Sequence, residues 1–175
     1  MDNQDFKNKE FQDKRFSKID FTSCNFSNSV FINCTFINCN FSNADFSDCS
    51  FRGACFLKCK LLGIAFARIN TLLLDWTFKD SKIELCSFDR SVMKNGKFIG
   101  CQLKESDFSD SDFEGSKFSS SDLQGSIFRN TNLEKCDFTG AKNYYMDPFQ
   151  NRLKGAKFSQ PEVLALLAGF KIEII

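Results

Sequence analysis

The chain has 175 residues, enough for one domain with a sizeable core, and it contains no histidine. The lack of histidine excludes Ser-His-Asp and Cys-His nucleophile systems and removes the commonest transition-metal ligand. Lysine plus arginine (23) nearly balance aspartate plus glutamate (22), so the net charge gives no overall attraction to DNA or to an anionic membrane. No stretch reaches the ~18–20 apolar residues of a membrane span, and the polar start is not a signal peptide, so we expect a cytoplasmic protein.

Phenylalanine occurs 23 times and recurs at every fifth position from Phe6 to Phe66, with Leu61 as the one substitute. We resume the count at Leu73 and follow it to Phe138, and Leu153 and Phe158 keep the same register. A five-residue step scatters side chains around an α-helix and sends them to alternate faces of a flat strand. The chain must therefore turn once per five residues, which predicts a stacked coil whose central residues all point to the axis. The period alone does not distinguish three sides from four.

A second pattern lies two residues before each central residue, where the side chain is almost always small. Residues two apart on an extended segment share a face, so each side of the coil sends one large and one small group inward. Eight of the nine cysteines occupy this small position, where serine and alanine replace them, and only Cys55 lies outside it. Because the chain has no CxxC pair, we assign the cysteines to core packing rather than to a disulfide or metal framework.

The resulting unit, [small]-[Asn/Asp]-[Phe/Leu]-x-x, as in CNFSN, ADFSD, SDFEG and CDFTG, resembles the pentapeptide-repeat family over about residues 4–158. The resemblance implies an all-β fold, a right-handed quadrilateral β-helix with four pentapeptides per coil. We assign residues 1–158 to this solenoid and residues 159–175 to a C-terminal cap. A filled core leaves no pocket that holds an acid–base pair, so we expect no enzyme, no cofactor and no metal.

The register slips within residues 67–77 (ARINTLLLDWT), where seven residues rather than five separate Phe66 from Leu73. One interpretation is a bulge or small loop that rotates one part of the rod against the other. The alternative is a partner contact through exposed Leu72, Leu74 and Trp76, because apolar side chains that interrupt a regular surface can anchor a partner.

Residues 105–141 carry eight carboxylates against three basic side chains, a net charge of −5. Turn chemistry alone explains this excess if Asp is simply favoured before the central residue. The alternative is a negative strip that imitates DNA phosphates and binds a protein partner. Its residues are Glu105, Asp107, Asp110, Asp112, Glu114 and Asp122.

The C-terminal segment 159–170 (SQPEVLALLAGF) predicts a helix that covers the last coil, with Ser159 as N-cap, Glu162 completing a capping box and Gly169 as the stop. Residues 171–175 (KIEII) predict an apolar strand. One short helix cannot cover this apolar end, so we expect a two-fold contact between subunits. Its residues are Val163, Leu164, Leu167, Phe170, Ile172 and Ile174.

This end also resembles the C-terminus of the Qnr and MfpA members of the family. The resemblance implies a homodimer through the C-terminus and DNA gyrase or topoisomerase IV as the partner. It further implies DNA mimicry and quinolone tolerance, without direct contact with nucleic acid or membrane. The alternative function is a general scaffold or regulatory interaction module with an unknown partner.

Overall fold

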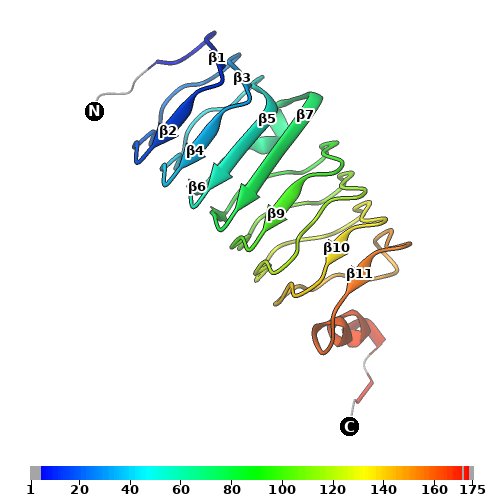
Figure 1. Cartoon of the computed structure of the whole chain (residues 1–175). Coiled ribbons are helices and arrows are strands. Elements are labelled where there is room, and N and C mark those ends of the chain that lie inside the picture. Colours follow the sequence, from blue (N-terminus) through cyan, green and yellow to red (C-terminus); the bar gives the residue numbers. More distant parts are fainter. Residues whose placement is uncertain (1–4, 171, 174–175) are drawn as a thin grey trace.

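The computed structural model describes residues 5–170 and 172–173, and these form a rod of stacked coils (Figure 1). Each coil pairs in parallel with the next at a spacing of twenty residues, as in the bridges Asp5↔Asn25, Asp20↔Asn40 and Asp112↔Asn132. Twenty residues correspond to four five-residue sides. The pairing therefore decides for four sides, and the quadrilateral β-helix expected from the resemblance is confirmed.

The longest ladder of the rod runs along one side and is parallel throughout. It comprises β2 (Arg15–Ser17), β4 (Thr35–Ile37), β5 (Ser50–Leu57), β7 (Asn70–Lys79) and β9 (Lys97–Ile99). Shorter ladders join β1 to β3 and β5, β6 to β8, and β10 to β11. Their bounds are β1 (Glu10–Gln12), β3 (Val30–Ile32), β6 (Lys60–Leu62), β8 (Lys82–Glu84), β10 (Asp137–Phe138) and β11 (Lys157–Phe158).

The central phenylalanines fill the interior in two geometries. Along the axis, rings stack face to face, as between Phe88 and Phe108 with centroids 4.8 Å apart and planes 4° apart. Around one coil, neighbouring rings meet edge to face, as between Phe108 and Phe113 at 5.3 Å and 74°. Each such pair adds about 0.5–1.5 kcal/mol to the burial of its apolar area. The five-residue period thus predicts these core positions correctly.

The small inward positions also tie the coils together by hydrogen bonds. The Ser121 hydroxyl donates to the carbonyl of Phe98 and accepts from the Cys101 N–H, both at 3.0 Å. Cys136 replaces such a serine, and its thiol donates to the Phe113 carbonyl at 3.1 Å. All nine cysteines carry free thiols, and only Cys55 is not fully buried. Their place in the core is as the sequence predicts.

The corners of the coil require a left-handed backbone two residues after many central residues. Asn28 and Asp48 both adopt φ of 58° there, and Gly115 adopts 73°. Asparagine, aspartate and glycine tolerate this conformation best. At Gly115 the close approach adds a second reason, because an added Cβ would lie 2.6 Å from Oδ1 of Asn95. Turn geometry therefore places carboxylates and amides at regular intervals along the rod.

The register slip is a two-residue insertion absorbed within β7, next to the short 3-10 helix η1 (Phe66–Arg68). Ser50 still pairs with Asn70, but Ala54 pairs with Trp76, so the spacing rises from twenty to twenty-two residues. The inward assignment of Leu73 is wrong: its side chain is 67% exposed and its φ is 59°. Trp76 enters the interior instead, and its bulk fills this part of the core.

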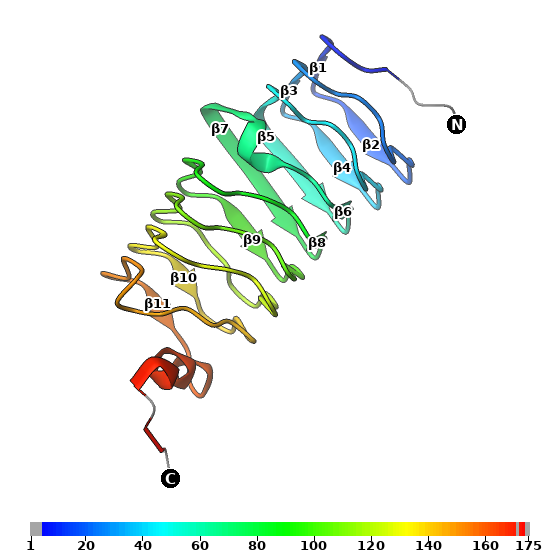
Figure 2. The ribbon, with the colours of Figure 1, turned by 180° about the vertical axis from the view of Figure 1, so that it is seen from behind.

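The C-terminal end leaves the regular path twice. Between the bridges Asp122↔Lys142 and Asn132↔Arg152, the backbone of residues 143–150 makes no pairing bond to the coil below, although Tyr144 and Met146 have buried side chains. The cap is a 3-10 helix, η2 (Glu162–Phe170), which lies at the end of the rod (Figure 2). The sequence predicts an α-helix here; short helical segments readily tighten into this form.

Two details of the predicted cap are wrong. The Ser159 hydroxyl does not cap η2 but accepts the N–H of Gly140 at 2.9 Å, which fastens the start of the helix to the previous coil. Gly169 is not the stop, because the helix continues to Phe170. Of the predicted strand 171–175, residues 172–173 belong to no strand, and the other three lie outside the described residues.

Candidate functional site

The six predicted acidic residues form a ring around one coil rather than a strip along the rod. They span positions 105–122, fewer than the twenty residues of one coil. Asp107, Asp112 and Asp122 each precede the central residue of a different side, so their carboxylates point in different directions. A strip parallel to the axis would need acidic residues twenty positions apart. The strip geometry expected from the sequence is therefore wrong.

Lysines from neighbouring coils neutralise part of this ring. Glu114 lies 2.6 Å from Nζ of Lys135 in the coil above and 3.0 Å from Nζ of Lys94 in the coil below. The hydrogen bonds from Lys135 and then Lys94 lower the pKa of Glu114 to about 2. Lys94 also reaches Asp112 at 3.2 Å. Because these pairs are exposed, solvent screens them strongly.

Several of the remaining carboxylates in the ring support the fold locally. Asp107 accepts the N–H of Ser109 at 2.9 Å, and Asp110 accepts the side-chain amide of Asn130 at 3.1 Å. Asp122 lies 3.6 Å from Nζ of Lys104. Such contacts are what turn chemistry predicts for Asp before a central residue or at a corner. They favour the structural interpretation of the acidic cluster.

The insertion in β7 offers a smaller apolar surface than the sequence predicts. Leu72 is 68% exposed, whereas Leu74 is half-buried and packs against the core. Trp76 is only 2% exposed, so its assignment as a surface anchor is wrong. Leu73 takes its place as the second exposed apolar residue of this segment.

A basic row, which the sequence reading does not identify, follows the long ladder. Lys97 pairs with Lys117, which pairs with Asp137, which pairs with Lys157, so these side chains share one side of the rod. Asp137 is the acidic member of this row, and its pKa is lowered, chiefly by a hydrogen bond from Thr139. Comparing residues twenty positions apart would have found the row, because neighbours on the surface are coil neighbours rather than sequence neighbours.

The C-terminal end carries an exposed apolar surface. Leu164 is 43% exposed, Phe170 49% and Ile172 57%. Phe149, at 78% exposed, contacts Phe170 with ring centroids 5.3 Å apart, and its lack of a place in the five-residue register was a signal in the sequence. Val163 and Leu167 are half-buried, and Ile174 lies outside the described residues.

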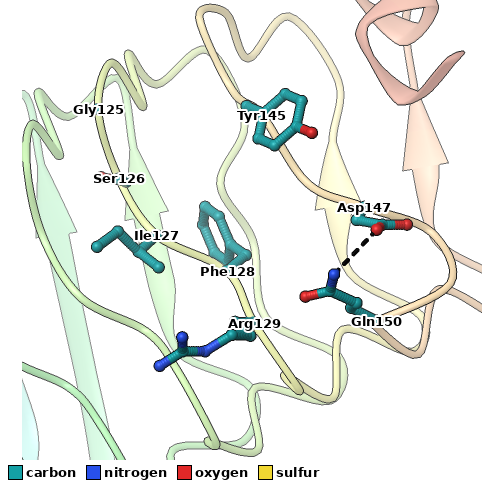
Figure 3. Close-up of a pocket in the computed structure, with 8 residues that line it drawn as sticks. All are labelled: Gly125, Ser126, Ile127, Phe128, Arg129, Tyr145, Asp147 and Gln150. Atoms are coloured by element: carbon teal, nitrogen blue, oxygen red, sulfur yellow. Dashed lines mark hydrogen bonds between the residues drawn. The ribbon is translucent and has the colours of Figure 1, made fainter. Parts of the chain in front are cut away.

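A pocket of about 410 Å³ opens near this end, between the segment 125–129 and the excursion 143–151 (Figure 3). Figure 3 shows Phe128 between Ile127 on one side and Tyr145 and Asp147 on the other, with Arg129 nearby. Gln150 donates a hydrogen bond to Asp147 at 3.1 Å and closes the rim. The filled core expected from the sequence predicts no such pocket. It forms where the coil leaves its regular path.

Within the described part of the chain, no helix is long and apolar enough to cross a membrane. In the same part, no three potential metal ligands gather into a cluster.

Parallel coils of four five-residue sides, each with a phenylalanine or leucine at its centre, define a pentapeptide-repeat solenoid. The family model described as pentapeptide repeats matches residues 15–53, 86–125 and 106–142 in eight copies, and the chain belongs to this family.

Solved structures resemble the rod over most of its length. Full-length QnrB1, a plasmid-mediated fluoroquinolone resistance protein, aligns with a TM-score of 0.54 and 20% identity, covering 94% of this chain and 91% of that chain. A trypsin-treated form of QnrB1 aligns with a TM-score of 0.52 and 21% identity, covering 100% and 94%. HetL, a pentapeptide repeat protein involved in heterocyst differentiation regulation from the cyanobacterium Nostoc sp. strain PCC 7120, gives a TM-score of 0.29 and 13% identity, with 84% of each chain covered. At these identities the likeness to QnrB1 concerns the fold. No curated protein sequence matches the chain.

Proposed function

We propose that this protein is a non-enzymatic, homodimeric rod that binds a type II topoisomerase, DNA gyrase or topoisomerase IV, and gives quinolone tolerance. The observation that carries this function is a solenoid with an apolar C-terminal end, where Leu164, Phe170 and Ile172 stay exposed in a single chain. Covering that end with a second copy gives the simplest closed symmetry. The match to QnrB1 over nearly the full length of both chains supports a rod of the same kind.

The rod binds its partner with its outer surface, because the central side chains fill its interior. We assign the topoisomerase contact to the acidic ring of residues 105–122, the part of the chain with the densest negative charge. In a dimer, two such rings lie on either side of the two-fold contact. Each ring offers carboxylates to the basic surface with which a topoisomerase binds DNA phosphates.

A supercoiling assay with purified gyrase, with and without a quinolone, tests this function. We expect the protein to inhibit supercoiling at high concentration or to restore it when quinolone is present. Asp110→Lys should abolish the effect, whereas Asp48→Lys should preserve it, because both residues occupy the same left-handed corner and only Asp110 belongs to the ring. Lys18 and Lys58 adopt the same φ region, so the folded chain accepts lysine there. If the parent has no effect on gyrase, the topoisomerase function is wrong.

A second function is favoured by the ion pairs. Because Lys94 and Lys135 neutralise Glu114, and because Lys97, Lys117 and Lys157 share another side, the rod has charged surfaces of both signs. Such a surface suits a general scaffold or regulatory module with a partner other than a topoisomerase. An inactive result in the supercoiling assay, with a stable dimer in solution, would favour this second function.

A further inference from the structure

The pocket in Figure 3 lies where one column of stacked rings ends. In this column Phe66, Phe88, Phe108 and Phe128 follow one another with centroids 4.7, 4.8 and 4.8 Å apart. The next position would fall at Pro148, but residues 143–150 do not pair with the coil below, and regular pairing resumes only at Asn132↔Arg152. Phe128 is also buried, with 5% of its surface exposed, and the other three rings are completely buried.

The backbone beside Phe128 is an unpaired strand edge. One coil lower, the N–H of Phe108 donates to the carbonyl of Ile127 at 2.9 Å, and the N–H of Asp110 donates to the carbonyl of Arg129 at 2.8 Å. The equivalent donors one coil higher are the N–H groups of Phe128 and Asn130. Neither meets an acceptor among the residues that the structure describes.

An acceptor on the same edge is also unused. The N–H of Ile127 donates to the carbonyl of Ser106 at 3.0 Å, so the carbonyl of Ser126 should accept in the next coil. No described residue donates to it. The backbone edge at residues 126–130, most of which lines the pocket, therefore presents one carbonyl and two N–H groups in the register of the parallel ladder. An exposed edge of this kind accepts an extended peptide by strand addition.

We propose that this pocket binds an extended segment of a partner protein with the sequence apolar–aromatic–acidic. The first residue lies above Ile127, donates its N–H to the carbonyl of Ser126 and accepts from the N–H of Phe128. The aromatic residue lies above Phe128. The carbonyl of the third residue accepts from the N–H of Asn130. This register repeats that of the two coils below, where the N–H groups of Phe88 and Phe108 donate to the carbonyls of Asp107 and Ile127.

The side chains that line the pocket select the three residues. Ile127 is 51% exposed and favours an apolar neighbour, while Tyr145, which is 61% exposed, offers its ring to an aromatic side chain beside the small exposed part of Phe128. Arg129 is exposed and forms no ion pair within residues 5–170 and 172–173, so its guanidinium is available to a carboxylate on the third residue. Asp147 is held by the N–H of Phe149 at 2.8 Å and by Gln150, so it does not compete for Arg129.

The test uses a fluorescein-labelled peptide, Thr-Val-Phe-Glu-Thr, acetylated and amidated, with anisotropy as the readout. We expect saturable binding to the full chain and shifts in the amide NMR signals of Phe128 and Asn130. Replacing Phe by Ala in the peptide, or Ile127 by Asp in the protein, should weaken binding at least about tenfold. Asp107 occupies the position equivalent to Ile127 one coil lower, so this variant keeps the fold.

A charge exchange tests the register. Arg129→Glu should weaken the peptide at least about tenfold and should prefer Thr-Val-Phe-Lys-Thr over the original. Arg90→Glu makes the same charge change two coils lower, and it should bind like the parent. No saturable binding, or equal losses in Arg129→Glu and Arg90→Glu, would overturn the site.

The remaining candidate occupant is the protein's own C-terminal segment, because Phe170 contacts Phe149 beside the pocket. Deleting residues 171–175 distinguishes a partner peptide from the protein's own C-terminal segment as the occupant of the pocket. If the peptide binds only after this deletion, the segment fills the pocket itself and the partner site is wrong. If the deletion leaves the affinity unchanged, the site belongs to a partner. This measurement does not involve a topoisomerase, so its result is independent of the supercoiling assay.

Discussion

Trp76 lies directly below Gly96 in the stack of small inward positions, and a Cβ on Gly96 would lie 3.4 Å from Nε1 of Trp76. The same Cβ would lie 3.2 Å from the ring of Phe98. The largest side chain of the protein thus occupies a small position, and the chain carries glycine immediately above it. The indole N–H of Trp76 is buried and meets no acceptor in the described part of the chain.

Gly96→Val should destabilise the protein by about 1–3 kcal/mol, because the added methyl groups overfill the space beside Trp76 and Phe98. Urea unfolding measures this change. In a Trp76→Phe background the same substitution should cost less, because the smaller ring leaves room. Equal costs in both backgrounds would show that the two residues do not compete for space.

Phe113→Ala should destabilise the protein by roughly 3–5 kcal/mol, because a buried ring leaves a cavity among its neighbours. Phe113 is completely buried and meets Phe108 and Phe118. Leu85→Ala is the matched control: Leu85 is 57% exposed, so we expect a change within about 0.5 kcal/mol. An unchanged melting temperature for Phe113→Ala would contradict the inward assignment.

Glu114→Gln should lower the melting temperature at pH 7, and this difference from the parent should vanish near pH 2. The folded state holds the pKa of Glu114 at about 2, below its ordinary value of 4.5, through Lys135 and Lys94. The ion pairs therefore contribute fully above about pH 4.5, and the contribution is lost as the pH falls to about 2. Glu105→Gln is the control, because Glu105 forms no ion pair with a described residue. A constant difference across the pH range would show that the pairs do not stabilise the fold.

The cysteines should behave as buried small residues. Burial raises the pKa of Cys49, Cys86, Cys101 and Cys136 to about 12, so iodoacetamide at pH 8 should leave them unmodified in the folded protein. Cys55, which is half-buried, should react first, and all nine should react in guanidinium chloride. Mass spectrometry after timed alkylation measures the order in which the cysteines are modified.

The same assignment predicts that cysteine is replaceable. Changing Cys24, Cys34 and Cys39 to serine or alanine should retain the fold by circular dichroism. Dithiothreitol should not alter the melting temperature, and a large shift on reduction would indicate a disulfide.

Leu164→Asp should convert a dimeric parent into a monomer in light scattering. Leu164 is 43% exposed, and a charge in an apolar contact between subunits is costly to desolvate. Leu166 provides the contrast, because it packs against the core of its own chain. Leu166→Asp should therefore lower the melting temperature of the single chain, which Leu164→Asp should leave unchanged. A parent that is monomeric at micromolar concentration would rule out the dimer.

The five-residue period predicts the fold because every regular side places one large and one small side chain in the same inward positions. It fails at Leu73 because the two inserted residues displace this part of the chain from the axis, and Trp76, which stands at the small inward position two residues before Phe78, enters the core. The period also does not predict the buried side chains of Tyr144 and Met146, since residues 143–150 do not pair with the coil below. The predicted core is right wherever the backbone stays regular.

The candidate surfaces are harder to predict, because charges that are neighbours along the chain are not neighbours on the surface of the rod. Asp107 and Asp112 are close in sequence but lie on different sides, whereas Lys97 and Lys117 are distant in sequence and adjacent on the surface. Reading the sequence in steps of twenty gives the correct neighbours. The pocket beside Phe128 depends on the course of residues 143–151, which no repeat pattern specifies.

The two-residue insertion in β7 leaves the twenty-residue pairing before and after it unchanged, since Asn40 pairs with Lys60 and Lys97 with Lys117. Added length is therefore confined to the outside of one coil and does not disturb the coils above and below. Genes of this kind can consequently gain or lose surface loops at a corner, or duplicate whole coils, while the remaining protein still folds. A single corner of the rod can therefore change its outer surface while the stacked core stays the same.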